Sequence, residues 1–111
     1  VMDSPGREPE ILTGLAAAGC NVIAFATGRG APQGFPFVPV VKLTGNALTW
    51  EKMRDHMDLS VAGVIEGTES LPEAGQRILK TLLDVASGAR TRAEITGYTR
   101  AMDIYVTGPV I

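Results

Sequence analysis

The stretch Asn21-Val22-Ile23-Ala24-Phe25-Ala26-Thr27-Gly28-Arg29-Gly30 decides how this chain folds. Residues 21–26 form a short, mostly apolar run with β-branched members and no charge, which is typical of a strand covered on both faces. Residues 27–30 follow it directly, and their glycines let the backbone approach a ligand closely. We therefore expect a buried strand that ends in a ligand-binding turn.

The flanking segments predict a helix before this strand and a second strand after it. Pro9 suits the first helical turn, where its missing N–H costs nothing, and Gly19 is a natural end of that helix. Three glycines and two prolines exclude a regular element over residues 27–37. Residues 38–43 return to strand character, with Pro39 near the start of the strand.

The second half of the chain continues the alternation. Asn46 predicts the cap of a helix over residues 47–57, and residues 59–65 are a weaker strand candidate. Two capping-box pairs predict two more helices, and they are formed by Ser70 with Glu73 and by Thr91 with Glu94. The first of these helices ends at Gly88, and residues 104–106 resemble a last short strand or an extended tail. This order predicts a small α/β layered domain with a mainly parallel sheet flanked by helices.

Length and composition limit the classes of function. The 111 residues suit a single domain, and 45% hydrophobic with 20% charged residues is ordinary for a globular protein. The net charge is −2 and the ten Lys and Arg residues are dispersed, which argues against binding to nucleic acid or anionic membranes. The single Cys20 cannot form an internal disulfide, and a reducing cytoplasm is the expected location.

Two loops are candidates for binding, because ligands of open parallel sheets bind outside the carboxyl ends of the strands. In the first loop, Thr27-Gly28-Arg29-Gly30, backbone N–H groups and the Arg29 fork suit a carboxylate. The second loop, residues 42–46, offers the Lys42 cation and the Asn46 amide at a helix N-terminus. An ordinary turn with a solvated arginine, and an Asn46 that serves only as a helix cap, are the alternative interpretations.

Other sites are disfavoured by the sequence. Gln33 and Pro32 break the spacing and the helix that a dinucleotide-binding fingerprint requires. His56 is the only histidine, so with one cysteine the chain shows no closed zinc site. Asp58, Glu66 and Glu69 are weak candidates for oxygen ligands of a hard cation. The residues by themselves thus indicate an α/β domain with a candidate anion loop and no assigned reaction.

Several motifs in a fixed order resemble the C-terminal end of the altronate/galactarate dehydratase family, whose relatives include sulfolactate sulfo-lyase large subunits. They are Met2–Gly6, Phe25–Gly30, Val41–Leu43 with Asn46, Met57–Leu59 followed by Ile65–Thr68, and Val85–Gly88. The resemblance implies a hydro-lyase of sugar-acid metabolism that abstracts a proton beside a carboxylate and expels the neighbouring hydroxyl. It also implies a divalent metal, typically iron, which stabilises the charge that develops in such a reaction.

The resemblance also implies roles for particular residues. Arg29 suits the substrate carboxylate, with Thr27, Gly28, Gly30 and Asn46 as further substrate-binding residues. Asp3 and Lys42 match the family pattern and are the candidate catalytic residues, with acid and base unassigned. Metal ligands are expected in an upstream part of the protein, and the sequence leaves the metal and the sugar acid open.

The chain begins Val1-Met2 rather than with an initiator methionine, and we expect a C-terminal piece of a longer dehydratase. The expected partners are therefore an upstream domain of the same protein and a small hydroxy acid, and a homo-oligomer is left open. Two alternatives are a non-catalytic α/β domain for assembly or small-anion binding, and a freestanding small-molecule binding protein. By itself, the 111-residue chain is expected to be inactive.

Overall fold

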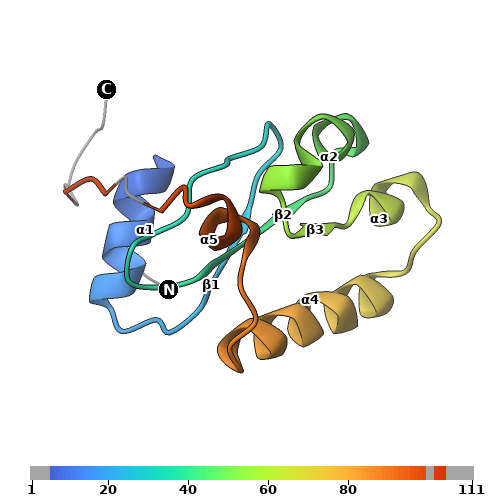
Figure 1. Cartoon of the computed structure of the whole chain (residues 1–111). Coiled ribbons are helices and arrows are strands. Elements are labelled where there is room, and N and C mark those ends of the chain that lie inside the picture. Colours follow the sequence, from blue (N-terminus) through green and yellow to red (C-terminus); the bar gives the residue numbers. More distant parts are fainter. Residues whose placement is uncertain (1–5, 100–101, 105–111) are drawn as a thin grey trace.

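The computed structural model describes residues 6–99 and 102–104 (Figure 1). Three strands form one parallel sheet in the order β1 (Ile23–Ala26), β2 (Val40–Thr44) and β3 (Leu59–Ser60). The helices, in chain order, are α1 (Glu8–Ala17), α2 (Ala47–Met53), the 3-10 helix η1 (Arg54–His56), α3 (Ala62–Glu66), α4 (Leu71–Ala86) and α5 (Arg92–Thr96). The predicted small α/β domain with a parallel sheet is confirmed.

Helix α1 covers one face of the sheet and contributes to the main hydrophobic core. Its Leu12 is fully buried against Ile23 and Val40, which lie opposite each other in the register of β1 and β2. The loop between these strands adds Phe35 and Val38 to the same cluster. Parallel strands are usually joined by a helix. Here the predicted irregular loop joins β1 to β2 instead, and it supplies core side chains.

Helix α4 covers the other face of the sheet. Successive side chains of a strand point to opposite faces, so the fully buried Val41 faces away from the core around Val40. Helix α4 packs against β2 and buries Ala74 and Val85. Figure 1 shows the strands running between α1 at the left and α4 along the bottom. The domain is thus a thin sheet with helices on both faces.

Both predicted capping boxes are confirmed. Ser70 accepts a hydrogen bond from the Glu73 N–H while the Glu73 carboxylate accepts one from the Ser70 N–H, and Thr91 and Glu94 repeat the arrangement.

Even α4, which is 16 residues long and ends before Gly88, is too short and too polar to cross a membrane, and the other described helices are shorter.

Three predictions about the elements are corrected. Strand β1 is covered on one face only, because Ala24 and Ala26 are exposed. The strand expected over residues 59–65 has two residues, and α3 begins at Ala62. The helix expected to reach residue 57 changes to η1 after Met53. Ile104 lies in no strand, and the other two residues of the predicted last strand are outside the described residues.

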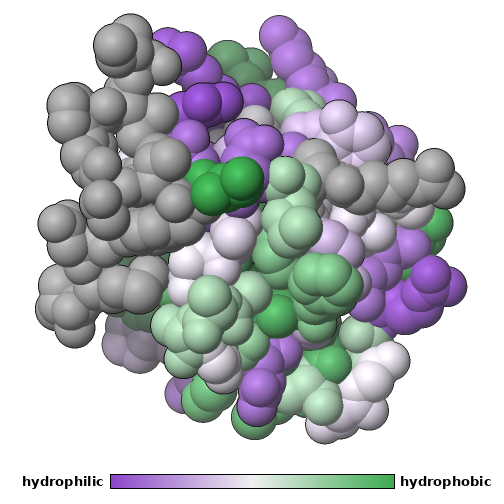
Figure 2. Space-filling model, turned by 90° about the vertical axis from the view of Figure 1, so that its left-hand side faces the viewer, coloured by the Kyte–Doolittle hydropathy of each residue, from purple (hydrophilic) through white to green (hydrophobic). Residues whose placement is uncertain are grey.

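Exposure is uneven along α1 as well. Figure 2 views the domain from the α1 side and shows hydrophobic residues across much of that face. Ala17 and Ala18 at the end of this helix are exposed although they belong to the apolar segment. The apolar residues of α1 and its C-terminal end are therefore only partly buried by the described part of the chain.

We expect the Leu12→Ala variant to lose about 2–5 kcal/mol of unfolding free energy, because it leaves a cavity in the core. Leu71→Ala makes the same chemical change at a side chain that is 75% exposed, and should cost less than about 0.5 kcal/mol. Urea unfolding of both variants measures the difference. Equal losses would contradict the described core.

Candidate functional site

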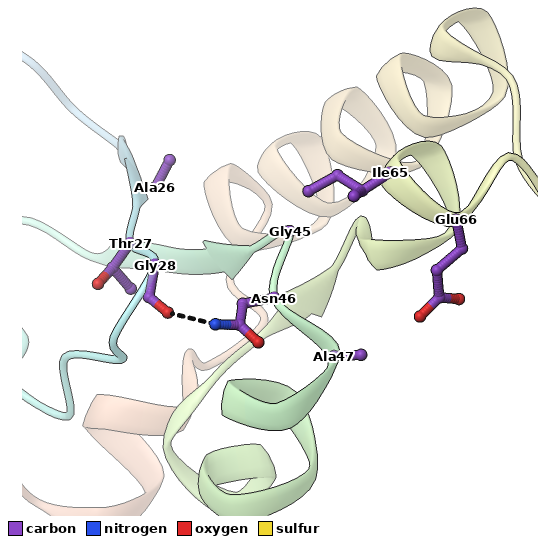
Figure 3. Close-up of a pocket in the computed structure, with 8 residues that line it drawn as sticks. All are labelled: Ala26, Thr27, Gly28, Gly45, Asn46, Ala47, Ile65 and Glu66. Atoms are coloured by element: carbon purple, nitrogen blue, oxygen red, sulfur yellow. Dashed lines mark hydrogen bonds between the residues drawn. The ribbon is translucent and has the colours of Figure 1, made fainter.

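A pocket of about 620 Å³ lies where the loops after β1 and β2 meet the first turn of α2 and the end of α3 (Figure 3). Because β1 and β2 are parallel, their carboxyl ends meet at one edge of the sheet, where ligands of such folds bind. The residues that line the pocket are Ala26, Thr27, Gly28, Gly45, Asn46, Ala47, Ile65 and Glu66.

The loop after β1 is held by backbone geometry. The Thr27 N–H donates to the Leu43 carbonyl at 2.9 Å, which extends the β1–β2 ladder by one residue. The Gly30 N–H then donates to the Thr27 hydroxyl at 3.1 Å. Gly30 has φ +87°, and a Cβ at this position would overlap the Met53 sulfur. The turn therefore favours glycine at residue 30 for its conformation, and a larger residue there would also displace the Met53 side chain of α2.

Asn46 joins this loop to α2. Its Oδ1 accepts hydrogen bonds from the N–H groups of Leu48 at 3.0 Å and Thr49 at 3.4 Å, which caps the helix as predicted. Its Nδ2 donates to the Gly28 carbonyl at 3.2 Å (Figure 3), and the Thr49 hydroxyl donates to the same oxygen at 2.7 Å. Asn46 thus caps the helix as predicted and also lines the pocket, and its role in substrate binding stays a prediction.

Arg29 lies next to the pocket but not in its lining. Its neighbour Gly28 lines the pocket, whereas the Arg29 residue is exposed. Among the residues that the structure describes, the guanidinium has no hydrogen-bond or ion-pair partner. Within the described residues, the exposed Arg29 guanidinium is therefore available to an anion.

Lys42 is not part of this pocket. It lies inside β2 rather than in the loop after it, and its side chain is fully buried. Its ammonium forms an ion pair with Glu8 of α1 and lies 5.0 Å from the centroid of the Phe25 ring. Burial lowers the pKa of Lys42 to about 8, and the Asp58 carboxylate opposes this shift. The sequence-based grouping of Lys42 with Asn46 is therefore corrected, because strand alternation sends this side chain toward α1.

The other predicted residues are distributed as follows. Asp3 lies outside the described residues. The two carboxylate oxygens of Asp58 accept hydrogen bonds from the backbone N–H groups of Lys42 and Arg92, each at 2.7 Å. Asp58 is therefore engaged in holding the backbone. Glu69 pairs with Arg77 through two hydrogen bonds on the surface. Of the carboxylates considered for a cation, only Glu66 therefore reaches the pocket.

Sequence reasoning missed the part of α3 that lines the pocket. The segment around Ile65 was predicted as the end of a strand, although Ile65-Glu66-Gly67-Thr68 was one of the motifs behind the family resemblance. Gly67, with φ +74°, ends α3 and was the local signal for a helix C-terminus there. Gly45 completes this side of the pocket, because a Cβ on it would come within 2.9 Å of Ile65 Cδ1.

Comparison with known proteins assigns the family. The sequence model described as "D-galactarate/Altronate dehydratase, C-terminal" matches residues 1–109. The chain belongs to this family. It is 40% identical over 87% of its length to a (2R)-sulfolactate sulfo-lyase subunit beta of Chromohalobacter salexigens. Two enzymes of Escherichia coli K12 are also similar, an altronate dehydratase (31% identical over 97% of the chain) and a galactarate dehydratase (32% over 88%).

The chain spans only 25%, 21% and 19% of these three relatives, respectively. Within the galactarate/altronate dehydratase C-terminal domain, three of the motifs that carried the resemblance meet around the pocket. They are Phe25–Gly30, the motif of Val41–Leu43 with Asn46, which reaches the pocket through Asn46, and Ile65–Thr68. Motifs that are far apart in the sequence therefore converge at one edge of the sheet.

The pKa of Lys42 predicts a pH dependence of stability. Because its folded-state pKa is about 8 and the ordinary value is 10.5, the folded state binds fewer protons than the unfolded state between these values. The unfolding free energy should therefore rise with pH across this window, by up to about 1.4 kcal/mol per pH unit from this group. Urea unfolding from pH 7 to 10.5 should show this rise in the difference between the wild-type protein and Lys42→Met.

Lys80→Met is the matched control, because the side chain of Lys80 is 76% exposed. Its difference from the wild-type protein should stay flat over the same pH range. A flat difference for Lys42→Met as well would contradict the description of Lys42 as a desolvated cation.

Proposed function

We propose that this domain forms one side of the active site of a sugar-acid hydro-lyase of the altronate/galactarate type. The observation that carries the proposal is the convergence of three family motifs on the pocket at the carboxyl ends of β1 and β2. A hydroxy acid would bind there as the small-molecule substrate. The reaction removes a proton beside the substrate carboxylate and expels the neighbouring hydroxyl as water.

The binding role belongs to the loop after β1. Arg29 would bind the substrate carboxylate with its two-pronged guanidinium, at the side of the pocket formed by Thr27 and Gly28. Gly30 keeps this turn close to α2, and Asn46 fixes the Gly28 carbonyl, so the loop is already in place before a substrate binds. Such preorganisation supports a role in positioning rather than in proton transfer.

Proton transfer requires groups beyond this pocket. Glu66 is the only side chain in the lining that carries a charge, and dehydration needs both a proton acceptor and a means to assist the departing hydroxyl. Lys42 is buried against α1 and supports the fold. We therefore propose that the remaining catalytic groups come from the upstream part of a family-length protein.

The family resemblance implies a divalent metal, typically iron. Within the described residues, no group of three or more His, Cys, Asp or Glu side chains could hold such an ion, and Glu66 is the one carboxylate in the pocket. These residues do not suit a complete metal site, and we assign no step of the reaction to a metal bound by them. The proposal places the metal ligands mostly in the upstream part.

A second reaction is favoured by the sulfo-lyase relative, whose 40% identity exceeds the 31% and 32% found for the two E. coli dehydratases. In this case the group lost from the carbon next to the site of proton abstraction would be sulfite instead of water. The requirement for a carboxylate-binding arginine is the same in both reactions. The substrate panel should therefore include sulfolactate beside aldonic and aldaric acids.

We expect Arg29→Ala, in the full-length protein with added ferrous iron, to lower kcat/KM about 10- to 100-fold, because one charge-assisted contact is worth roughly 1.5–3 kcal/mol. Dehydration is followed by keto-acid formation, and sulfite release is measured separately. Arg54→Ala removes another exposed arginine outside the pocket and should leave kcat/KM unchanged. Equal activity of Arg29→Ala and wild type would exclude the carboxylate role.

We expect the isolated 111-residue chain to turn over none of these substrates, because its pocket lacks a complete set of catalytic groups. The same assay applies, with enzyme at concentrations well above those needed for the full-length protein. Robust product formation by the isolated chain would show that the site is complete without an upstream part. Absence of lyase activity in the full-length protein would favour the non-catalytic alternative, an assembly or anion-binding domain.

A further inference from the structure

Helix α4 exposes a row of leucines beside the stripe that it buries. Ala74 and Val85 face the sheet, whereas Leu79 and Leu83 lie farther round the helix, on the side away from Arg77, and are each 58% exposed. A surface helix normally places polar side chains on such a flank. The polar side of α4 is elsewhere, since Lys80 and Asp84 form an exposed ion pair that lies between Leu83 and Arg77 around the helix.

The contacts of Arg77, on the opposite side of the helix, show which way the leucine flank faces. Arg77 donates to the Ser60 carbonyl of β3 at 2.8 Å and to the Glu69 carboxylate. One flank of α4 therefore faces β3. Because the sheet order is β1-β2-β3, the leucine flank faces the side of β1.

Strand β1 is bare on this same side. Ala24 lies opposite Val41 in the register, so both point to the face that α4 covers, but α4 buries only Val41 and leaves Ala24 exposed. Ala26 follows on the same face, and Figure 3 shows it and Ile65 projecting to the side on which α4 runs. Ile65 is 76% exposed. We call the five aliphatic residues Ala24, Ala26, Ile65, Leu79 and Leu83 the β1–α4 surface.

The β1–α4 surface has two properties that define what fits it. Its five residues are all uncharged and aliphatic, so it suits an apolar partner rather than an ionic one. It also reaches the pocket, because Ala26 and Ile65 line both. A segment that covers this surface would therefore lie at the edge of the candidate active site.

We propose that the β1–α4 surface docks the upstream part of a family-length dehydratase chain, through aliphatic side chains of that part. The matched region is a C-terminal domain and 25% or less of each relative, so most of a family-length polypeptide lies before it and needs contact surface with it. The inference rests on the proposed function in one respect, that the docked part completes the pocket. A second copy of this domain is the competing occupant.

Cysteine labelling in the full-length protein tests whether the surface is covered. We expect Leu79→Cys to react with a maleimide at least about tenfold more slowly than Lys80→Cys, with rates measured at each site by peptide mass spectrometry. The two positions are adjacent on one helix and both are exposed in the domain, which makes them a matched pair. Similar rates would show that nothing covers the leucine flank and would overturn the proposal.

Photo-crosslinking identifies the occupant. A benzophenone side chain at position 79 of the full-length protein should form crosslinks to peptides from the upstream part, and the same group at position 80 should not. Isotope-mixed samples reveal crosslinks between residues 1–111 of two copies, and such crosslinks would overturn the proposal in favour of a second copy. Neither readout depends on turnover, so a failure of the lyase assay remains distinguishable from a failure of docking.

Discussion

The hydrogen bond from Asn46 Nδ2 to the Gly28 carbonyl connects the two loops on which the candidate site depends. The same side chain caps α2 through its Oδ1, so one amide fixes the helix N-terminus and the turn after β1 together. Removing it would leave the Gly28 carbonyl with only the Thr49 hydroxyl as partner, and α2 without its cap. The geometry of the pocket therefore depends on a neutral polar contact between two segments that the parallel sheet brings together.

A buried lysine connects α1 to the opposite side of the sheet. Lys42 is held between Glu8, the face of Phe25 and the nearby Asp58, and its ammonium has no exposed surface. A buried cation is tolerated only where such partners offset its desolvation. The lysine of the family-like Val41-Lys42-Leu43 motif therefore connects α1 to the sheet, whereas its neighbours along the chain lead into the pocket. One motif thus contributes both to the fold and to the site.

The described domain combines an incomplete pocket with an uncovered aliphatic surface. Within the described residues, its pocket has one carboxylate and a loop held in place by Asn46, and its aliphatic β1–α4 surface reaches the same edge. A small domain with helices on both faces of its sheet rarely exposes aliphatic side chains on both a strand and the neighbouring helix unless another segment packs there. The proposed upstream part would account for both features, because it would cover the sheet and add catalytic groups.

Local sequence determined those features of this protein that depend on neighbouring residues. Asn46 as a cap, the capping boxes at Ser70 and Thr91, the turn at Gly28-Arg29-Gly30 and the strand character of β1 and β2 follow from contacts within a few residues. Only the tertiary structure decided which face each strand residue occupies, that Lys42 points to α1, that α3 replaces a longer β3, and that Ala24 remains uncovered. These outcomes depend on sheet register and on which helix lies over which strand, and such packing between distant segments leaves no periodic pattern in strands of only two to five residues.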